Sequence, residues 1–374
     1  NKMAKFNVDL SNCANEPIHI PGAIQSWGFL VVINASTNVI NYVSANIVQY
    51  LNVTGGTILG QKLSFLENYI TSESEPNPLT AYVETAKRKD NAEQEAYPVS
   101  VSGKHYELLI HRNGNLMILE FESKSKDSVT DIHTQIGRSV SMVLSATELP
   151  EILEQAACVV KDLIRYDRVM IYKFMEDAHG KVVAECKEDD LEPFFDLHYP
   201  ASDIPAQARE LYKINRSRII ADAYAETSSI LALKDTPLDL THSILRSVSP
   251  IHIQYLKNMG VASSFSISMV CKGQLWGLIA CHNYTPKFIN HRVREGARLL
   301  GQIISSTVEF KEEELLTKNR KKHEAVLDTI ISQLRTDREI KDVVLSSQSS
   351  FRNVVKASGA ALVFEGAIIK DGQT

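Results

Sequence analysis

Short apolar runs rich in β-forming residues recur between residues 28 and 122 and predict β-strands: GFLVVIN, NVINYVS, HYELLIHR and NLMILEFE. Asn, Gly and Ser separate the apolar runs, and RNGN at 112–115 has the residues of a hairpin tip. Before this region lies a polar, proline-containing segment that favours no helix. We therefore expect an N-terminal arm, 1–22, and a small α+β domain, 23–122.

A helical period takes over after a polar linker at 123–131. Helices are predicted near 132–146 and 148–165, followed by four strands. The strands are 168–174, 181–187, 263–270 and 274–283. The stretch between the second and third strands, about 188–255, shows no regular pattern, and a loop of that length inside a compact domain is usually functional. We expect the ligand pocket there.

One long helical pattern runs from about 290 to 338, with apolar residues at helical spacing and many charges between them. A periodic run well beyond 25 residues is typical of a coiled coil or a domain-linking helix. The alternative is two amphipathic helices with a break near 318–322. The last residues predict a helix and two strands that open a third domain. We place the second domain at 130–312, and the linking helix with the start of the third domain at 313–374.

Composition narrows the class of protein. The chain has 374 residues, which suggests two or three domains, and 44% hydrophobic with 23% charged residues is ordinary for a globular protein. A net charge of -5 argues against a general nucleic-acid binder. No signal peptide and no apolar run of about 20 residues is visible, so we expect no membrane span. The five cysteines form no C-x-x-C pair, which indicates reduced thiols in the cytoplasm rather than a disulfide framework or a metal site.

Cys13 lies in the polar arm beside EPIHIPG, where a thiol is available for a covalent adduct. The alternative is an ordinary surface thiol, which the spacing alone favours. A cysteine hydrolase that uses Cys13 with His252 is a further alternative. It lacks a helix start at Cys13, which would lower the pKa of the thiol.

The segment DLHYPASDIPAQARELY, at 196–212, holds Asp203 between Pro200 and Pro205. A carboxylate in this position either caps the helix that begins near Gln207 or is held rigidly toward a ligand. The sequence alone leaves both interpretations open.

Charged and polar residues gather again within 245–283. Arg246, together with Arg218, has the forked donors that clamp carboxylates. His252 lies at a predicted helix start, and His282 lies at the end of an apolar strand. Each histidine is either a ligand contact or a buried structural residue.

Four segments resemble the bacteriophytochrome family, in the family's order: NCANEPIHIPGAIQ, YPASDIPAQARELY, SPIHIQYLKNMGVASS and QLWGLIACHN. The resemblance runs from about residue 8 to the end. It implies an α+β fold in which a PAS and a GAF domain, antiparallel sheets flanked by helices, are joined by a long helix to a partial PHY domain. It also implies a figure-of-eight knot, in which the arm threads through a GAF loop, although knots are rare.

The resemblance also implies the pigment. Plant and cyanobacterial relatives attach a bilin through a cysteine directly before the pocket histidine, and Ile251 occupies that position here. Cys13 matches the attachment cysteine of the branch that binds biliverdin IXα through a thioether to its A-ring vinyl group. One departure is IQSWG at 24–28, where the family commonly has a Pro-His pair. Ser26 and Trp27 leave the local packing there open.

By the same resemblance, the pocket residues contact different parts of the pigment. Asp203, Ile204 and Pro205 would face the pyrrole rings, and the Asp203 carbonyl would accept from ring N–H groups. His252 would share a central water with the rings and hold a propionate. The remaining propionate contacts would be Tyr212, Arg218, Arg246, Ser249, Ser264 and Ser266, and the D-ring contacts Tyr172, Tyr199, Tyr255 and His282.

The function that the family implies is a red/far-red photoreceptor, which signals by Z/E isomerisation at the D-ring and is not itself an enzyme. A histidine kinase output outside this chain, a downstream response regulator and a homodimer through the GAF helices and the long helix are implied with it. A tongue of the third domain pairs with the aspartate in the family, so we expect impaired photoconversion if this is the whole polypeptide. The alternatives are a near-infrared fluorescent protein derived from a phytochrome, which the intact Asp203 disfavours, and a GAF sensor of another small molecule.

Overall fold

The computed structural model describes residues 15–88, 95–124, 132–336, 339–344, 352 and 357–372. Cys13, the predicted attachment residue, lies outside the described residues. The chain divides into two compact units, 1–306 and 307–374, which are described separately.

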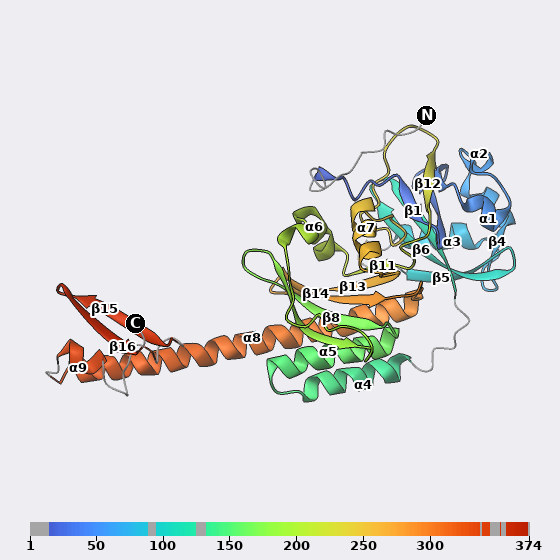
Figure 1. Cartoon of the computed structure of the whole chain (residues 1–374). Helices are drawn as coiled ribbons and strands as arrows, with labels where there is room; N and C mark the ends of the chain where they lie inside the picture. Colours follow the sequence, from blue (N-terminus) through green and yellow to red (C-terminus); the bar gives the residue numbers. More distant parts are fainter. Residues whose placement is uncertain are drawn as a thin grey trace. The chain divides into compact units, whose positions relative to one another are not determined.

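An eight-stranded antiparallel sheet dominates the first part of the chain (Figure 1). Its strands in spatial order are β1 (Ala23–Gln25), β12 (Thr227–Ala232), β3 (Ile40–Ser44), β2 (Gly28–Asn34), β7 (Leu116–Ser123), β6 (Lys104–Asn113), β5 (Glu95–Val101) and β4 (Ile70–Thr71). The predicted hairpin at 112–115 is confirmed, since β6 and β7 pair across Gly114 with its φ of 56°. Glycine suits this left-handed turn position because it has no Cβ.

Strand β2 is buried on both faces, which explains its continuous apolar run GFLVVIN. Phe29, Val31 and Ile33 belong to one core, while Leu30 and Val32 belong to another on the opposite face. Because successive side chains of a strand point to opposite faces, a strand with a core on each side needs apolar residues at every position.

Short helices that the sequence did not predict cover the first of these cores. They are α1 (Ile47–Leu51), α2 (Gly55–Ile58), the 3-10 helix η2 (Leu63–Asn68) and α3 (Pro78–Lys87). Ile47, Ile58 and Leu79 contribute fully buried side chains to this core. Segments of four to ten residues repeat the helical period too few times to be recognised from the pattern.

The described end of the N-terminal arm lies between two parts of one distant loop, residues 221–249, which we call the knot loop. Strand β1 pairs on one side with β12, which belongs to this loop. On its other side, the Gln25 N–H donates to the Leu245 carbonyl at 2.8 Å. The chain therefore passes between two limbs of one loop, as the predicted knot requires, while the arm before residue 15 lies outside the described part.

The second sheet has six antiparallel strands, and four of them match the strands predicted for this domain. In spatial order they are β10 (His198–Tyr199), β9 (Gly180–Lys187), β8 (Arg168–Phe174), β14 (Gln274–Asn283), β13 (Ser263–Cys271) and β11 (Ser217–Ile220). Helices cover both of its faces (Figure 1). On one face lie α4 (Ile132–Ser145), α5 (Leu149–Ile164) and the start of α8 (His291–Leu334), and on the other α6 (Ala206–Ile214) and α7 (Pro250–Asn258).

The expectation of an irregular stretch over 188–255 is wrong in part. Besides α6 and the start of α7, whose beginnings were predicted near Gln207 and His252, it contains β10, β11, β12 and the 3-10 helix η3 (Ala201–Asp203). The elements that were not predicted are two to six residues long, too short for a local period to mark them.

Helix α8 is continuous over 44 residues, so the alternative of a break near 318–322 is wrong. The second unit also contains α9 (Ile340–Val344) and the predicted two-stranded hairpin of β15 (Gly359–Phe364) and β16 (Ala367–Gly372). The helix predicted just before this hairpin falls largely on residues that are not described. In the described part of the chain, no helix combines the length and the apolar character that a membrane span needs.

Candidate functional site

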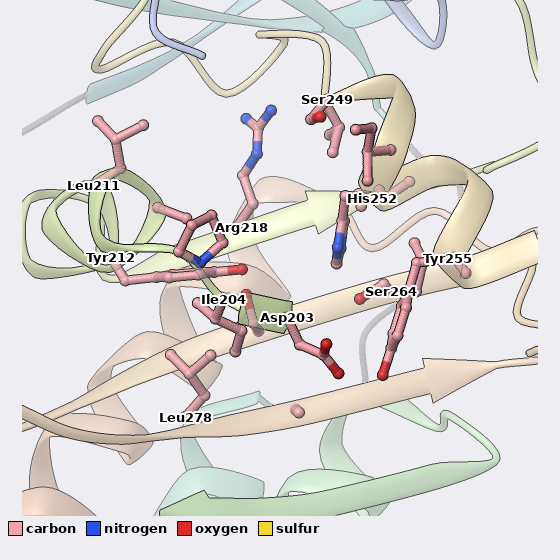
Figure 2. Close-up of a pocket in the computed structure, with 18 of the residues that line it drawn as sticks. Asp203, Ile204, Leu211, Tyr212, Arg218, Ser249, His252, Tyr255, Ser264 and Leu278 are labelled. Carbon is pink, nitrogen blue, oxygen red and sulfur yellow. The ribbon is translucent and has the colours of Figure 1, made fainter. Parts of the chain in front are cut away.

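A cavity of about 530 Å³ lies between the second sheet, α6, α7 and the knot loop. All fourteen predicted pocket residues within the described part of the chain line it; Figure 2 shows several of them. They are Tyr172, Tyr199, Asp203, Ile204, Pro205, Tyr212, Arg218, Arg246, Ser249, His252, Tyr255, Ser264, Ser266 and His282. The volume of the cavity is within the usual range for small-molecule and cofactor sites, about 300–1,000 Å³.

The register of the second sheet brings its lining residues onto one face. Leu278 of β14 lies opposite Tyr172 of β8, and two residues further along β14, Ala280 lies opposite Ser266 of β13. Each of these residues lines the cavity. Because alternate residues of a strand share a face, this register forms the floor of the cavity, with the Ser266 hydroxyl toward one end and the Tyr172 ring toward the other.

Asp203 does not cap the helix that follows it. Helix α6 begins at Ala206, its N-cap residue is Pro205, and no side chain caps it. The Tyr255 hydroxyl instead donates a hydrogen bond to the Asp203 carboxylate, and Figure 2 shows these two side chains pointing toward each other. Burial raises the pKa of Asp203, and the bond from Tyr255 partly offsets that rise. The capping interpretation is therefore wrong.

The two cavity histidines are neutral at neutral pH. Burial, with the positive charge of Arg218, lowers the pKa of His252 to about 4. Burial also lowers the pKa of His282 to about 3, together with its neighbours His252 and Arg168. The Nδ1 atom of His282 is buried and has no hydrogen-bond partner among the described residues. A buried ring nitrogen without a partner favours a ligand contact over a structural role.

The two cavity arginines differ in their contacts. The Arg218 guanidinium donates to backbone carbonyls of the knot loop, at 3.3 Å from Ile244 O, 3.4 Å from Ser247 O and closer still to Arg246 O. By contrast, the Nε and Nη1 atoms of Arg246 are buried without a partner in the described part of the chain. Burial lowers the pKa of both, and the nearby Arg246 adds to the effect on Arg218. Of the predicted pair of clamps, Arg218 therefore holds the knot loop, whereas Arg246 lines the cavity without such bonds from its Nε and Nη1 atoms to described residues.

Sequence reasoning missed Glu16, which also lines the cavity. Ser249 is the N-cap of α7 but makes no capping bond; its side chain bonds the Glu16 carboxylate. Burial raises the pKa of this carboxylate. A signal was present, because Glu16 stands three residues after Cys13 in the segment that resembles the family's attachment segment.

Sequence reasoning also missed most of the apolar lining and one glycine. The apolar residues include Met170, Val182, Phe194, Leu211 and Leu278. The alternation within 168–174 and 274–283 was a signal for two of them, since Met170 shares a face with Tyr172 and Leu278 with His282. A Cβ atom at Gly180 would lie 1.7 Å from Cζ of Tyr172, so the phenol ring occupies the space that only glycine leaves open.

Comparisons with known proteins agree with this fold and site. The family model of the PAS fold matches residues 13–124, and that of the GAF domain matches residues 148–308. Cyanobacterial phytochrome B of Nostoc sp. is 36% identical over 390 aligned positions, covering 98% of this chain and 50% of that protein. A bacteriophytochrome of Pseudomonas aeruginosa is 36% identical over 312 positions, covering 82% of this chain and 42% of that protein.

Two solved structures resemble the chain closely. The photosensory core module of the Stigmatella aurantiaca phytochrome superposes with a TM-score of 0.84 at 34% identity, covering 98% of this chain and 74% of that one. The chromophore-binding domain of a bacteriophytochrome from R. palustris superposes with a TM-score of 0.73 at 33% identity, covering 81% of this chain and 99% of that one. The chain belongs to the phytochrome family, as a bacteriophytochrome PAS–GAF module. It spans about half the length of the curated relatives that it matches.

Proposed function

We propose that this chain is the light-sensing module of a red/far-red photoreceptor and holds biliverdin IXα in the cavity, attached through Cys13. The observation that carries the proposal is the convergence of all fourteen predicted contacts on one cavity. These residues come from five separate segments of the sequence, so their meeting in one place does not follow from their spacing.

The chemistry of the lining fits a bilin with two propionates. Arg246 lines the cavity, and a largely buried guanidinium group is stabilised by an anion such as a propionate. Ser264 and Ser266 lie on the same sheet face as further donors. Aromatic and aliphatic residues line the rest of the cavity, as a flat conjugated ligand requires.

The distance from the arm to the cavity supports attachment at Cys13. Glu16 lines the cavity, and three residues of extended chain span about 10 Å at most. A connection of this length is short enough for a thiol at position 13 to react with a ligand in the cavity. Ile251 also lines the cavity, directly before His252, and its side chain offers no nucleophile for the alternative attachment.

A bound bilin would supply light absorption and Z/E isomerisation at its D-ring. Around that ring, neutral His282, which lines the cavity, would donate a hydrogen bond to the ring carbonyl. Tyr255 holds the Asp203 side chain in place, and the Asp203 carbonyl would accept from the ring N–H groups of a bound bilin. A change in the D-ring contacts would then alter the bond between Tyr255 and Asp203.

The sheet offers a path from the cavity to α8. Leu278 and Ala280 of β14 line the cavity, while Ile279 between them points to the opposite face. A Cβ atom added at Gly301 of α8 would lie 2.5 Å from Ile267 of β13 and 3.9 Å from Ile279, so this helix packs closely on the sheet. We infer that strain in β14 is passed to α8 here, and from α8 to a histidine kinase output in a cytoplasmic homodimer, with a response regulator downstream.

Absorption spectroscopy tests the proposal. The purified chain is mixed with biliverdin, and its spectrum is recorded before and after red light. We expect a red-absorbing complex whose spectrum changes under red light. No complex would contradict every bilin interpretation and favour a GAF sensor of another ligand. Bright near-infrared emission without a photoproduct would favour a fluorescent protein.

A further inference from the structure

We propose that Glu120, on strand β7 of the PAS domain, is a positioning residue for the pigment site: it holds the knot loop so that Arg246, which lines the cavity, meets a pigment propionate with its guanidinium group. The inference rests on the proposed function and adds a residue that lies outside the cavity lining. It assigns the PAS domain a part in pigment recognition.

Glu120 accepts hydrogen bonds from three successive residues of the knot loop. Its carboxylate accepts from the Leu245 N–H at 2.8 Å, from the Ile244 N–H at 3.3 Å and from the Ser243 hydroxyl. The side chain of Glu120 is only 1% exposed. Arg246 follows directly in the sequence, so these bonds fix the backbone from which its side chain extends.

Arg218 holds the same segment from the carbonyl side. It donates to the carbonyls of Ser243, Ile244, Arg246 and Ser247. Gln25 of β1 adds a bond from Nε2 to the Arg246 carbonyl at 3.4 Å. The Glu120 carboxylate therefore accepts hydrogen bonds from the donors of this segment, and the Arg218 guanidinium donates to its carbonyls. These bonds do not involve the Arg246 side chain, and Arg246 lines the cavity.

The charge of Glu120 also matters for both arginines. Burial raises the pKa of Glu120 to about 7, and above that pH its carboxylate favours the protonated forms of Arg218 and Arg246, which burial disfavours. The buried His111 has its Nδ1 atom 3.5 Å from the Glu120 carboxylate. Because burial keeps His111 neutral, it adds no positive charge beside Glu120. Burying a carboxylate costs desolvation energy. Three hydrogen-bond donors and two guanidinium groups offset that cost for Glu120.

Two pigments that differ only in their carboxylates test the inference. Reversible binding of biliverdin and of biliverdin dimethyl ester, which lacks propionate charge, is measured by absorption on the full chain carrying Cys13→Ser. In this background we expect Glu120→Gln to weaken biliverdin binding about tenfold and ester binding by less than about twofold. Arg246→Gln should show the same selective loss, and the double variant should be no weaker than Arg246→Gln alone.

Two further variants separate positioning from folding. Ser243→Ala removes one donor to Glu120 and keeps the carboxylate, so it should give the same selective loss at a smaller size, about threefold. Glu122→Gln removes another buried carboxylate of β7, which bonds Arg294 and not the knot loop. It should leave the ratio of the two affinities unchanged.

Equal weakening of both pigments by Glu120→Gln, or a loss that adds to that of Arg246→Gln, would overturn the inference and leave the proposed function intact. If the Cys13→Ser parent binds neither pigment, the proposed function fails and the inference fails with it.

Discussion

The Tyr255 hydroxyl donates a hydrogen bond to the Asp203 carboxylate and joins helix α7 to the segment before α6. Asp203 is the carboxylate that the sequence left open between a helix cap and a ligand-facing group. Its bond to Tyr255 places it in the cavity, which His252 also lines, and Figure 2 shows the Asp203 and Tyr255 side chains pointing toward each other. Both residues line the proposed pigment site, so the bond between them should respond to changes there.

Replacing Tyr255 with Phe should raise the pKa of Asp203 further. Burial already raises that pKa, and the bond from Tyr255 is what limits the rise. In a pH titration of the pigment absorption, the spectral change that accompanies protonation of Asp203 should therefore occur at a higher pH in Tyr255→Phe than in the parent. The exposed Tyr224 serves as the matched control, since Tyr224→Phe removes a hydroxyl outside the cavity. An unchanged step in Tyr255→Phe would show that this bond does not control Asp203.

The buried histidines should make the pigment-free chain less stable in acid. The folded-state pKa values of His252 and His282, about 4 and about 3, lie below the usual value of 6.5. Each neutral ring therefore contributes stability that is fully present above pH 6.5 and is lost as the pH falls toward the folded-state values. At pH 5 the loss should be about 2 kcal/mol for each histidine.

Urea unfolding at pH 7.5 and pH 5 measures this loss. His282→Gln should shrink the difference in unfolding free energy between the two pH values by about 2 kcal/mol. His105→Gln, at an exposed position, should leave it unchanged. Subtracting the variant's difference from that of the parent cancels groups of opposite sign that both share, such as Glu120, whose pKa is raised by burial to about 7. An equal difference in parent and His282→Gln would contradict this account.

Gly180→Ala should disturb the proposed D-ring site without unfolding the domain. The new methyl group would lie 1.7 Å from Cζ of Tyr172, so the phenol ring must move. We expect a shifted absorption band and a lower photoproduct yield, with a stability loss of about 1–3 kcal/mol. Gly137→Ala, where a Cβ atom would meet nothing within 4 Å, is the control. Spectra identical to those of the parent would show that the Tyr172 ring does not shape the site.

The ion pair between Glu122 and Arg294 should be important for holding β7 to the start of α8. Its atoms are 2.6 Å apart, and the side chains are 1% and 3% exposed. Glu122→Gln leaves a buried guanidinium without its carboxylate and should cost about 3 kcal/mol in thermal or urea unfolding. The pair of Glu295 and Arg298 is more exposed, so Glu295→Gln should cost less than about 1 kcal/mol. Similar costs for the two variants would contradict a special role for the buried pair.

Local pattern predicted the strands at the centre of the second sheet well. The expected boundaries of 168–174 and 274–283 are those of β8 and β14. Such strands carry regular apolar spacing along their whole length, because both their faces are packed. Sequence reasoning did not find β12, because its partners β1 and β3 lie nearly two hundred residues away. A short strand that is stabilised mainly by distant partners has little recognisable pattern in its own residues.

Residue types and the family resemblance predicted which residues line the candidate site. The structure adds which contacts each of these residues makes. Arg218 and Arg246 have the same side chain, and only the backbone carbonyls around Arg218 show that it holds the loop. Gly180 and Glu120 were not predicted because their roles depend on distant neighbours, Tyr172 and the knot loop. The roles of the individual pocket residues and the domain boundaries stay predictions.

Mass spectrometry of the pigment-treated chain tests the central claim most directly. The chain is incubated with biliverdin, denatured to remove unattached pigment and digested. We predict one added biliverdin on the peptide that contains Cys13, and none on the peptides with Cys158, Cys186, Cys271 or Cys281. A Cys13→Ser chain should lose all pigment on denaturation while still binding it in the native state. Pigment retained on another cysteine, or retained by the Cys13→Ser chain after denaturation, would contradict the account.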